Sequence, residues 1–319
     1  MNIEKPKTKQ ESIIKNSKAI STDRIERIAH SIFTVCAFMA VIAVASITLY
    51  MIIKGVPAIF KVGLTEILFG TVWKPTATNP SYGILYVILT SIVGTTMAII
   101  IGVPIGIGTA IFLTEIASKR VASVVQPAVE LLAGIPSVIY GLLGIIILNP
   151  LMYKLELIIF KDSTTHQFTG GANLISSILV LAIMILPTVI NISASSIRAV
   201  PVQLRNSSLA LGATRMQTIM KVTLPAAKSG IITAVVLGIG RAIGEAMAIS
   251  LVSGSVVNLP LPFNSVRFLT TAIVSEMSYA SGTHKEVLFT IGLILFVFIM
   301  IINISLNRIL KKGVNEHGA

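Results

Sequence analysis

The sequence predicts an all-α, polytopic membrane protein, and three observations lead to this fold class. Hydrophobic residues make up 54% of the 319 residues and charged residues only 12%, and the mean hydropathy is +0.89. A soluble chain with so few charges could not cover its own surface, whereas lipid needs no polar covering. The net charge of +12 resides in short segments between apolar runs. That pattern favours membrane-flanking loops over a nucleic-acid-binding face.

Six apolar segments are long enough to cross a bilayer, because about 20 helical residues span its hydrocarbon core. The predicted spans are 30–53, 83–113, 125–149, 173–195, 230–254 and 286–308. The second is too long for one straight span and too short for two. Because Pro104 lies in it among several glycines, we expect one kinked or tilted helix. Two spans there would move every later loop to the other side of the membrane.

The basic residues predict the orientation. With the N-terminus inside, the cytoplasmic segments and Arg308 hold 17 Lys and Arg, against seven in the three opposite loops. Cytoplasmic loops of membrane proteins carry this excess, so both termini are expected in the cytoplasm. The predicted organisation is a cytoplasmic tail (1–29), a six-helix transmembrane domain (30–310) and a second cytoplasmic tail (311–319).

Nothing in the sequence indicates a catalytic or metal site. Cys36 is the single cysteine and lies in the first apolar run, and the four histidines are scattered. No Gly-Lys dipeptide occurs, which excludes a phosphate-binding P-loop of the usual kind. We therefore expect no metal and no cofactor bound by this chain, and no enzymatic activity of its own.

The segment between the fourth and fifth spans, residues 198–228, is the most informative part of the chain. It carries five basic residues and no acid and is otherwise compatible with helix. Gly212 is expected to end a first short helix, Ala213 to Val222 to form a second, and Pro225 to lie near the start of the next element. Its physical pattern leaves two interpretations open, an amphipathic hairpin on the inner leaflet or a docking element for a cytoplasmic partner.

A family resemblance favours docking. The spacing of this segment resembles the EAA loop of ABC importer permeases, whose pattern is Glu-Ala-Ala, three residues, Gly, nine residues, Ile, one residue, Leu-Pro. The matching positions are Asn206, Ser207, Ser208, Gly212, Val222, Leu224 and Pro225. We call residues 198–228 the EAA-like segment. The resemblance implies coupling helices seated on an ATPase subunit, but Asn206-Ser207-Ser208 replaces Glu-Ala-Ala, so the charge contact of that glutamate is not expected here.

Further motifs resemble the phosphate members of these permeases. Residues 130–141 and 240–248 are similar to signatures of phosphate importer permeases, and residues 270–277 and 292–303 to the PstC type. The resemblance implies a type I importer permease of MetI-like architecture in the bacterial cell membrane. It also implies a PstA-like permease, two copies of a PstB-like ATPase that uses the ATP, and a PstS-like phosphate-binding protein. The alternatives are a permease for sulfate or molybdate, a proton-coupled secondary transporter, and a membrane sensor or scaffold.

Two charged residues lie in the fifth predicted span. Arg241 and Glu245 are four apart, which places them on one face of a continuous helix, and each is costly at the bilayer centre. Three interpretations are open: they pair only with each other, or Arg241 attracts phosphate in the pathway while Glu245 restrains it, or they contact only the partner subunit. Gly240 and Gly244 flank Arg241 at a spacing that permits close helix packing.

The third predicted span contains a break at Gly134-Ile135-Pro136. Such a break in lipid must be buried in protein or line a cavity, so it is either a packing kink or an anion site at which Ser137 and Tyr140 donate hydroxyls. Glu130 is interpreted as a residue that reaches the membrane surface. Arg267 and Glu276 are interpreted as solvated charges or contacts for a binding protein in the last external loop.

Overall fold

The computed structural model describes the backbone of residues 9–315 and the side chains of residues 26–305 and Arg308. The chain divides into two compact units, before and after the bond between Ile53 and Lys54. In the first unit, residues 9–53 form one helix, the larger part of α1 (Lys9–Val62). Its apolar side chains from Ile28 onward are largely exposed, Phe33 by 72%. Such a surface suits lipid and not water.

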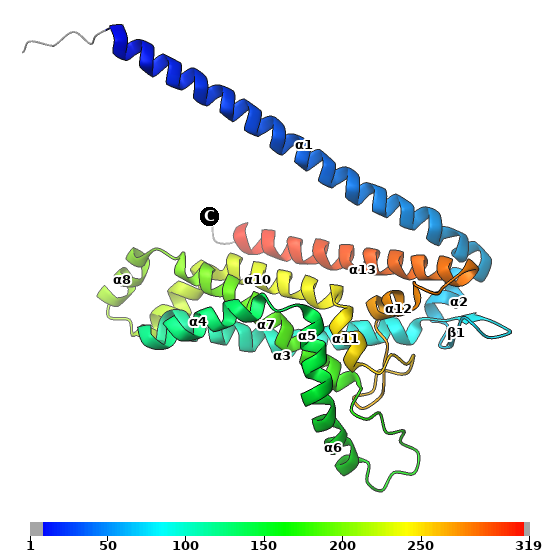
Figure 1. Ribbon diagram of the computed structural model, residues 1–319. Coiled ribbons are helices and arrows are strands. Elements are labelled where there is room, and N and C mark those ends of the chain that lie inside the picture. The colour runs from blue at the N-terminus through cyan, green and yellow to red at the C-terminus, as the bar shows by residue number, and fades with distance from the viewer. Residues whose placement is uncertain (1–8, 316–319) are drawn as a thin grey trace, which may run out of the picture. The chain divides into compact units, whose positions relative to one another are not determined.

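The second unit is helical apart from one short hairpin (Figure 1). After residues 54–62 of α1 its elements are α2 (Leu64–Phe69), β1 (Trp73–Lys74), β2 (Ser81–Tyr82), α3 (Leu85–Ile111), α4 (Lys119–Ala133), α5 (Ser137–Leu143), α6 (Asn149–Ile159), α7 (Leu174–Arg198), α8 (Val202–Ala210), α9 (Arg215–Thr218), α10 (Leu224–Gly244), α11 (Met247–Val252), α12 (Leu269–Glu276) and α13 (Gly282–Asn315). π-Helical turns follow α3 (Phe112–Ile116), α5 (Gly144–Leu148) and α9 (Ile219–Thr223).

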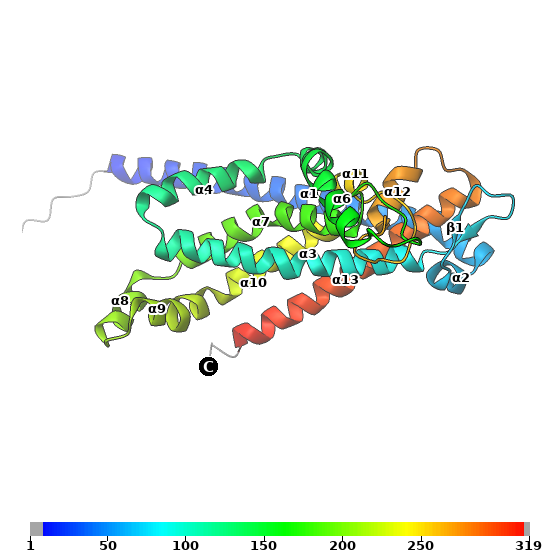
Figure 2. The ribbon, with the colours of Figure 1, turned by 90° about the horizontal axis from the view of Figure 1, so that it is seen from below.

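Helix α7 is the centre of the packed helices, with α3 and α10 against it (Figure 2). Buried small residues recur on α3 at every fourth position, from Gly94 through Ala98, Gly102 and Gly106 to Ala110. A side chain at Gly102 would meet Ile185 at 2.7 Å and the Ala182 carbonyl oxygen at 3.0 Å. Close approach of this kind supplies the van der Waals contact that holds helices together in lipid.

The six-span prediction is confirmed for the described residues. Six helices there are long and apolar enough to cross a membrane: Glu26–Val62, Leu85–Ile116, Ser137–Ile159, Leu174–Arg198, Arg215–Gly244 and Gly282–Ser305. The second span is a single helix with Pro104 inside it, as expected. The outer helices reach further than predicted, since α1 begins at Lys9 and α13 ends at Asn315. The remainder of both predicted tails, residues 1–8 and 316–319, lies outside the described residues.

The predicted boundaries of the third span are wrong. Residues 119–133 form the separate amphipathic helix α4, and the chain then breaks before α5 and α6. The spanning element is therefore 137–159 and not 125–149. Hydropathy is continuous across the break, and only the loss of helix at Gly134–Pro136 separates the two helices. Helix α6 projects away from α3 and α7 (Figure 1).

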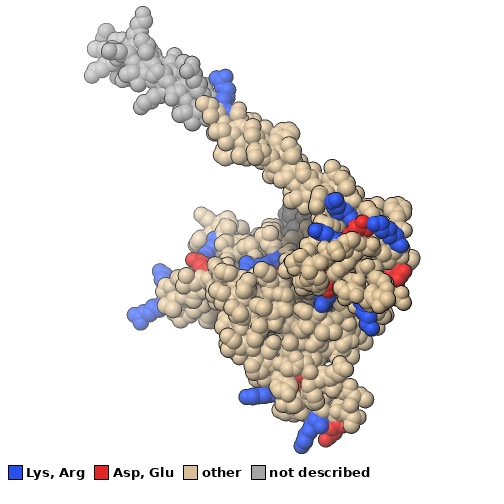
Figure 3. Space-filling model, turned by 45° about the vertical axis from the view of Figure 1, so that its right-hand side comes forward, with Lys and Arg blue, Asp and Glu red and all other residues tan. Residues whose placement is uncertain are grey.

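The second unit has two distinct ends. Helices α8 and α9 lie at one end, termed the α8 end, and the β1–β2 hairpin lies with α2 and α12 at the other, the hairpin end (Figures 1 and 2). The hairpin is antiparallel, with Trp73 opposite Tyr82. Between them the surface seen in Figure 3 is mostly uncharged, with Lys, Arg, Asp and Glu toward its margins. An uncharged middle between charged ends is the expected surface of a spanning bundle.

Candidate functional site

The break between α4 and α5 places Ser137 and Tyr140 at the start of a new helix. Tyr140 is buried, and its hydroxyl donates to the Leu132 carbonyl oxygen across the break at 2.7 Å. The same carbonyl oxygen, which Pro136 cannot serve because it has no N–H, also accepts the Ile135 N–H at 3.3 Å. The half-buried Ser137 hydroxyl makes no hydrogen bond within the described part of the chain. Tyr140 therefore stabilises the break, while Ser137 keeps its donor available.

A second break separates α10 from α11 at Glu245. Glu245 leaves the helical conformation, with φ −74° and ψ 130°. Its carboxylate accepts the N–H of Ala248 at 2.8 Å, and its carbonyl oxygen accepts the Thr270 hydroxyl at 2.6 Å. The prediction that Arg241 and Glu245 share one face of a continuous helix is therefore wrong, because α10 ends between them. The Glu245 carboxylate caps α11 in the manner of an N-terminal acidic residue.

Arg241 lies in the last turn of α10 and is half-buried. Its guanidinium donates to the Thr188 hydroxyl on α7 at 3.4 Å, and it lies within electrostatic range of Tyr140. No ion pair among the described residues joins Arg241 to Glu245. The described residues thus give this guanidinium a weak contact to a neutral hydroxyl and no carboxylate partner.

Helices α5 and α11 bring the two breaks together. Gly141 of α5 faces α11 so closely that a side chain there would meet the Ala248 Cα at 2.9 Å and Leu251 Cδ1 at 2.8 Å. The cap made by Glu245, the start of α5 and Arg241 are thereby gathered around one junction of interrupted helices. Interrupted helices with polar groups at their ends are the usual construction of transporter sites.

Gly240 and Gly244 flank Arg241 but pack against nothing in the described chain. A side chain at either position would have no heavy atom within 4 Å, and both are exposed. The close packing that their spacing permits is thus not made inside this chain. This side of α10 is open beside a partly buried arginine.

The EAA-like segment forms two short helices, as predicted. Helix α8 ends at Ala210, and Gly212 takes the left-handed conformation with φ +85°. Thr214 and Gln217 form a capping box that starts α9. The second helix is shorter than Ala213 to Val222, because it passes at Ile219 into a π-helical turn that leads to α10, with Pro225 in its first turn. Large apolar side chains are exposed along α8, α9 and the turns beside them: Val202, Leu204, Leu209, Leu211, Met216 and Met220.

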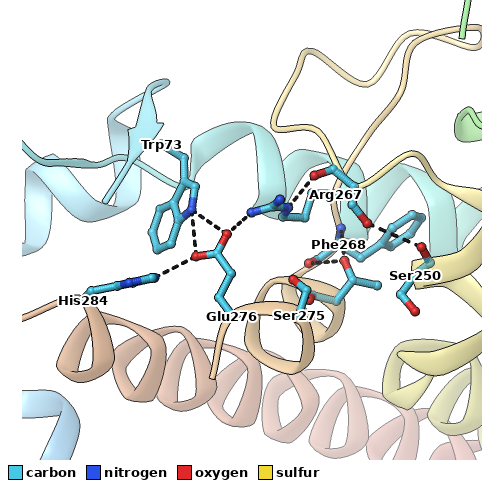
Figure 4. Close-up of polar contacts among 9 residues, drawn as sticks. Trp73, Ser250, Arg267, Phe268, Ser275, Glu276 and His284 are labelled. Atoms are coloured by element: carbon cyan, nitrogen blue, oxygen red, sulfur yellow. Dashed lines mark hydrogen bonds and ion pairs between the residues drawn. The ribbon is translucent and has the colours of Figure 1, made fainter. Parts of the chain in front are cut away.

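The hairpin end contains a buried polar cluster built on Glu276 (Figure 4). Its carboxylate, 5% exposed, accepts from Trp73 Nε1 at 3.1 Å, from His284 Nε2 at 2.7 Å and from the Arg267 guanidinium. Arg267 also donates from Nε to the Ser255 carbonyl oxygen at 2.8 Å. The interpretation of Arg267 and Glu276 as solvated charges is therefore wrong. The sequence offered no pairing signal, because the four side chains come from separate segments.

Within the part of the chain that the structure describes, six helices are long and apolar enough to cross a membrane, which is the fold of a polytopic membrane protein. The family model described as binding-protein-dependent transport system inner membrane component matches residues 102–316. The chain belongs to this family of ABC importer permeases. It is 41% identical to the probable ABC transporter permease protein YqgH of Bacillus subtilis, over 87% of this chain and 89% of that protein.

Relatives and solved structures agree on this architecture. Phosphate transport system permease proteins PstC from Pasteurella multocida and Haemophilus influenzae are 36% and 32% identical, covering 76% and 94% of this chain and 78% and 98% of theirs. A bacterial alginate ABC importer matches 72% of this chain and 79% of its own at a TM-score of 0.55 and 19% identity. The methionine transporter MetNI in an inward-facing form matches 72% and 94% at 0.50 and 19%. These two structures establish the MetI-like fold alone.

Proposed function

We propose that the chain is a transmembrane permease subunit of an ATP-driven, binding-protein-dependent importer of inorganic phosphate, with both termini in the cytoplasm of a bacterium. The observation that carries the proposal is Arg241, a partly buried cation at a junction of broken helices, to which the described residues offer the Thr188 hydroxyl as a hydrogen-bond partner. The likeness to PstC proteins supports phosphate as the anion. Sulfate and molybdate share its charge and oxygen geometry and are the competing substrates.

The site chemistry fits transient binding of an oxyanion. Arg241 supplies a delocalised charge with several donors that suit phosphate oxygens. Ser137 offers a further hydroxyl, whereas the hydrogen of the Tyr140 hydroxyl is engaged with Leu132. Glu245, occupied in capping α11, limits the net positive field near Arg241 without neutralising it directly. A translocation site must attract its ion and still release it.

The surfaces of the chain suit the expected partners. The open side of α10 at Gly240 and Gly244 lies beside Arg241, so a second, PstA-like permease packed there would complete the pathway. The exposed apolar side chains of α8 and α9 offer a face for one of two PstB-like ATPases. A PstS-like protein would deliver phosphate at the hairpin end. ATP is then used by the ATPases, and this chain binds no cofactor.

Uptake of radiolabelled phosphate into proteoliposomes that hold the four components tests the proposal. We expect uptake that requires ATP on the ATPase side, competes weakly with sulfate and molybdate, and falls by about tenfold or more in Arg241→Ala. Arg241→Lys is expected to retain part of the activity, and Lys154→Ala, an exposed cation of α6, to retain all of it. Uptake driven by a proton gradient without ATP would reject the proposal, and preference for sulfate or molybdate would reassign the substrate.

A further inference from the structure

Glu115 is a buried carboxylate at the α8 end, in the π-helical turn that follows α3. Its side chain is 9% exposed, and its Oε1 lies 3.0 Å from Nη1 of Arg205 on α8. No sequence pattern singles Glu115 out, because it lies outside both the apolar core of its span and the EAA-like segment. Buried carboxylates are rare unless paired, so this contact calls for a physical role.

Two arginines of the EAA-like segment converge on this turn and its neighbour. Besides its pairing with Glu115, Arg205 donates from Nη2 to the Ile197 carbonyl oxygen near the end of α7 at 2.6 Å. Arg215 of α9 donates to the backbone carbonyl oxygen of Glu115. The segment is thus attached through charged donors to the ends of two spans, α3 and α7.

The two short helices are also joined to each other. The hydroxyls of Ser208 on α8 and Thr218 on α9 lie 2.9 Å apart, and Thr218 is buried. A force on either helix therefore reaches both arginines. Both arginines contact Glu115, so this residue is a point at which a displacement of either helix reaches the second span.

The ion pair between Glu115 and Arg205 leaves some of its hydrogen-bonding groups unused. Glu115 Oε1 and Arg205 Nε each make no aligned hydrogen bond within the described residues. A carboxylate oxygen with unused acceptor capacity, beside a guanidinium whose Nε–H is also unused, can change the donor that it accepts from without losing its charge partner. That is the property expected of a contact with two arrangements, and π-helical turns often occur at functional sites.

We propose that Glu115 is a positioning residue for energy coupling, which transmits movement of α8 and α9 to the second span through Arg205 and Arg215. The inference rests on the proposed role of the EAA-like segment in docking an ATPase. An apolar contact could hold the segment equally firmly, since buried ion pairs add little net stability. What the charges add is a choice of specific donors, because Glu115 pairs with Arg205 at its carboxylate and accepts from Arg215 at its backbone oxygen.

The test measures phosphate imported per ATP hydrolysed by the complete four-component complex in proteoliposomes. Glu115→Gln and Arg205→Gln keep the side-chain length but remove the ion pair. We expect ATP hydrolysis to change by less than about twofold and the transport ratio to fall about tenfold, with the double variant no worse than either single one. Arg215→Ala removes the donor to the Glu115 backbone carbonyl oxygen and leaves the ion pair in place. We expect it to lower the transport ratio by a smaller factor. Glu130→Gln, an exposed carboxylate of α4 that pairs with Gln126, is the matched control.

Two results would overturn the inference. In the first, hydrolysis and uptake fall in proportion in Glu115→Gln and Arg205→Gln, as loss of a merely structural contact predicts. In the second, the transport ratio stays at the wild-type value in both Arg205→Gln and Arg215→Ala. This result rejects the inference even if Glu115→Gln does not accumulate in the membrane.

A cross-link separates this inference from the proposed function. With Cys36 replaced by serine, a cysteine at the exposed Ser207 is cross-linked to a cysteine introduced on the ATPase. Absence of a cross-link in an actively transporting complex would reject the docking role and this inference with it. A cross-link together with an unchanged transport ratio would reject only the inference. If the complex imports sulfate in place of phosphate, the same ratio is measured with sulfate.

Discussion

Glu276 accepts hydrogen bonds from three side chains and is almost fully buried, so its charge is compensated only while all three stay in place. Arg241 is the opposite case, a partly buried charge whose hydrogen-bond partner among the described residues is a neutral hydroxyl. The difference separates a residue that fixes structure from one that is free to receive a ligand. Charge alone, read from the sequence, does not distinguish the two.

Replacing Glu276 with alanine is expected to destabilise the hairpin end. It leaves Arg267 buried without its carboxylate, a loss of about 3–5 kcal/mol for a buried pair. The chain contains one tryptophan, and Trp73 donates to Glu276 directly. Thermal unfolding in detergent followed by tryptophan fluorescence therefore reports on the changed contact. Glu66→Gln, an exposed carboxylate of α2, is the control, and an unchanged midpoint in Glu276→Ala would contradict the structural role.

At the scale of elements, the sequence predicted what local patterns decide. Hydropathy located the spans, and Gly212 and Pro225 marked the turn between α8 and α9 and the start of α10. The break at Glu245 was missed because the local pattern is also compatible with a continuous helix, although Glu245 caps the next helix through the Ala248 N–H. The Thr270 hydroxyl, which reaches the Glu245 carbonyl oxygen from another part of the chain, leaves no local signal. The sequence pattern therefore located Arg241 in the correct span but wrongly placed Glu245 on the same continuous helix.

Gly141→Ala tests the contact between α5 and α11. The added methyl group would lie 2.8–3.0 Å from Leu251 and Ala248, so the two helices must separate, at a cost of about 1–3 kcal/mol. We expect reduced phosphate uptake and a lower unfolding temperature. Gly108→Ala on α3, where a side chain meets nothing within 4 Å, should leave both at wild-type values. Equal behaviour of the two variants would show that the contact is unimportant.

Gly212→Ala tests the turn between α8 and α9. Space is available, but φ +85° strains an alanine by about 1–2 kcal/mol. The turn should open and weaken retention of the ATPase by the permease during affinity purification. Asparagine tolerates the left-handed conformation better than alanine, so Gly212→Asn should retain more ATPase. If alanine and asparagine behave alike, backbone conformation is not the determinant.

At the scale of the whole molecule, many large apolar side chains lie exposed on the surface and not in the packed core. Lipid covers part of it, and the proposed permease partner would cover the open side of α10. Composition predicted the lipid contact, since a chain with 12% charged residues has no other means of covering itself. It could not predict which face is left for protein, because lipid-facing and partner-facing residues are equally apolar.

Gly240→Leu is expected to prevent pairing with the second permease while this chain still folds. No heavy atom of the described chain lies within 4 Å of a Cβ added at Gly240, which is exposed, so the leucine begins in open space. Co-purification of the PstA-like subunit should fall sharply, whereas the unfolding temperature of the isolated chain should stay the same. Gly108→Leu, equally unobstructed but on α3, serves as the control. Normal pairing in Gly240→Leu would place the partner on another face.

The contact between Trp73 and Glu276 also orders events during synthesis. The two residues are 203 positions apart, and His284 follows later still. The hairpin is therefore already translated, and the helices from α3 to α11 already made, before its anchoring carboxylate leaves the ribosome. The Trp73–Glu276 contact can therefore form only after the chain has been synthesised nearly to its last span. A chain that stops before residue 276 lacks the carboxylate that binds Trp73. Its hairpin is then not held against the helices and is open to proteases that remove incomplete membrane proteins.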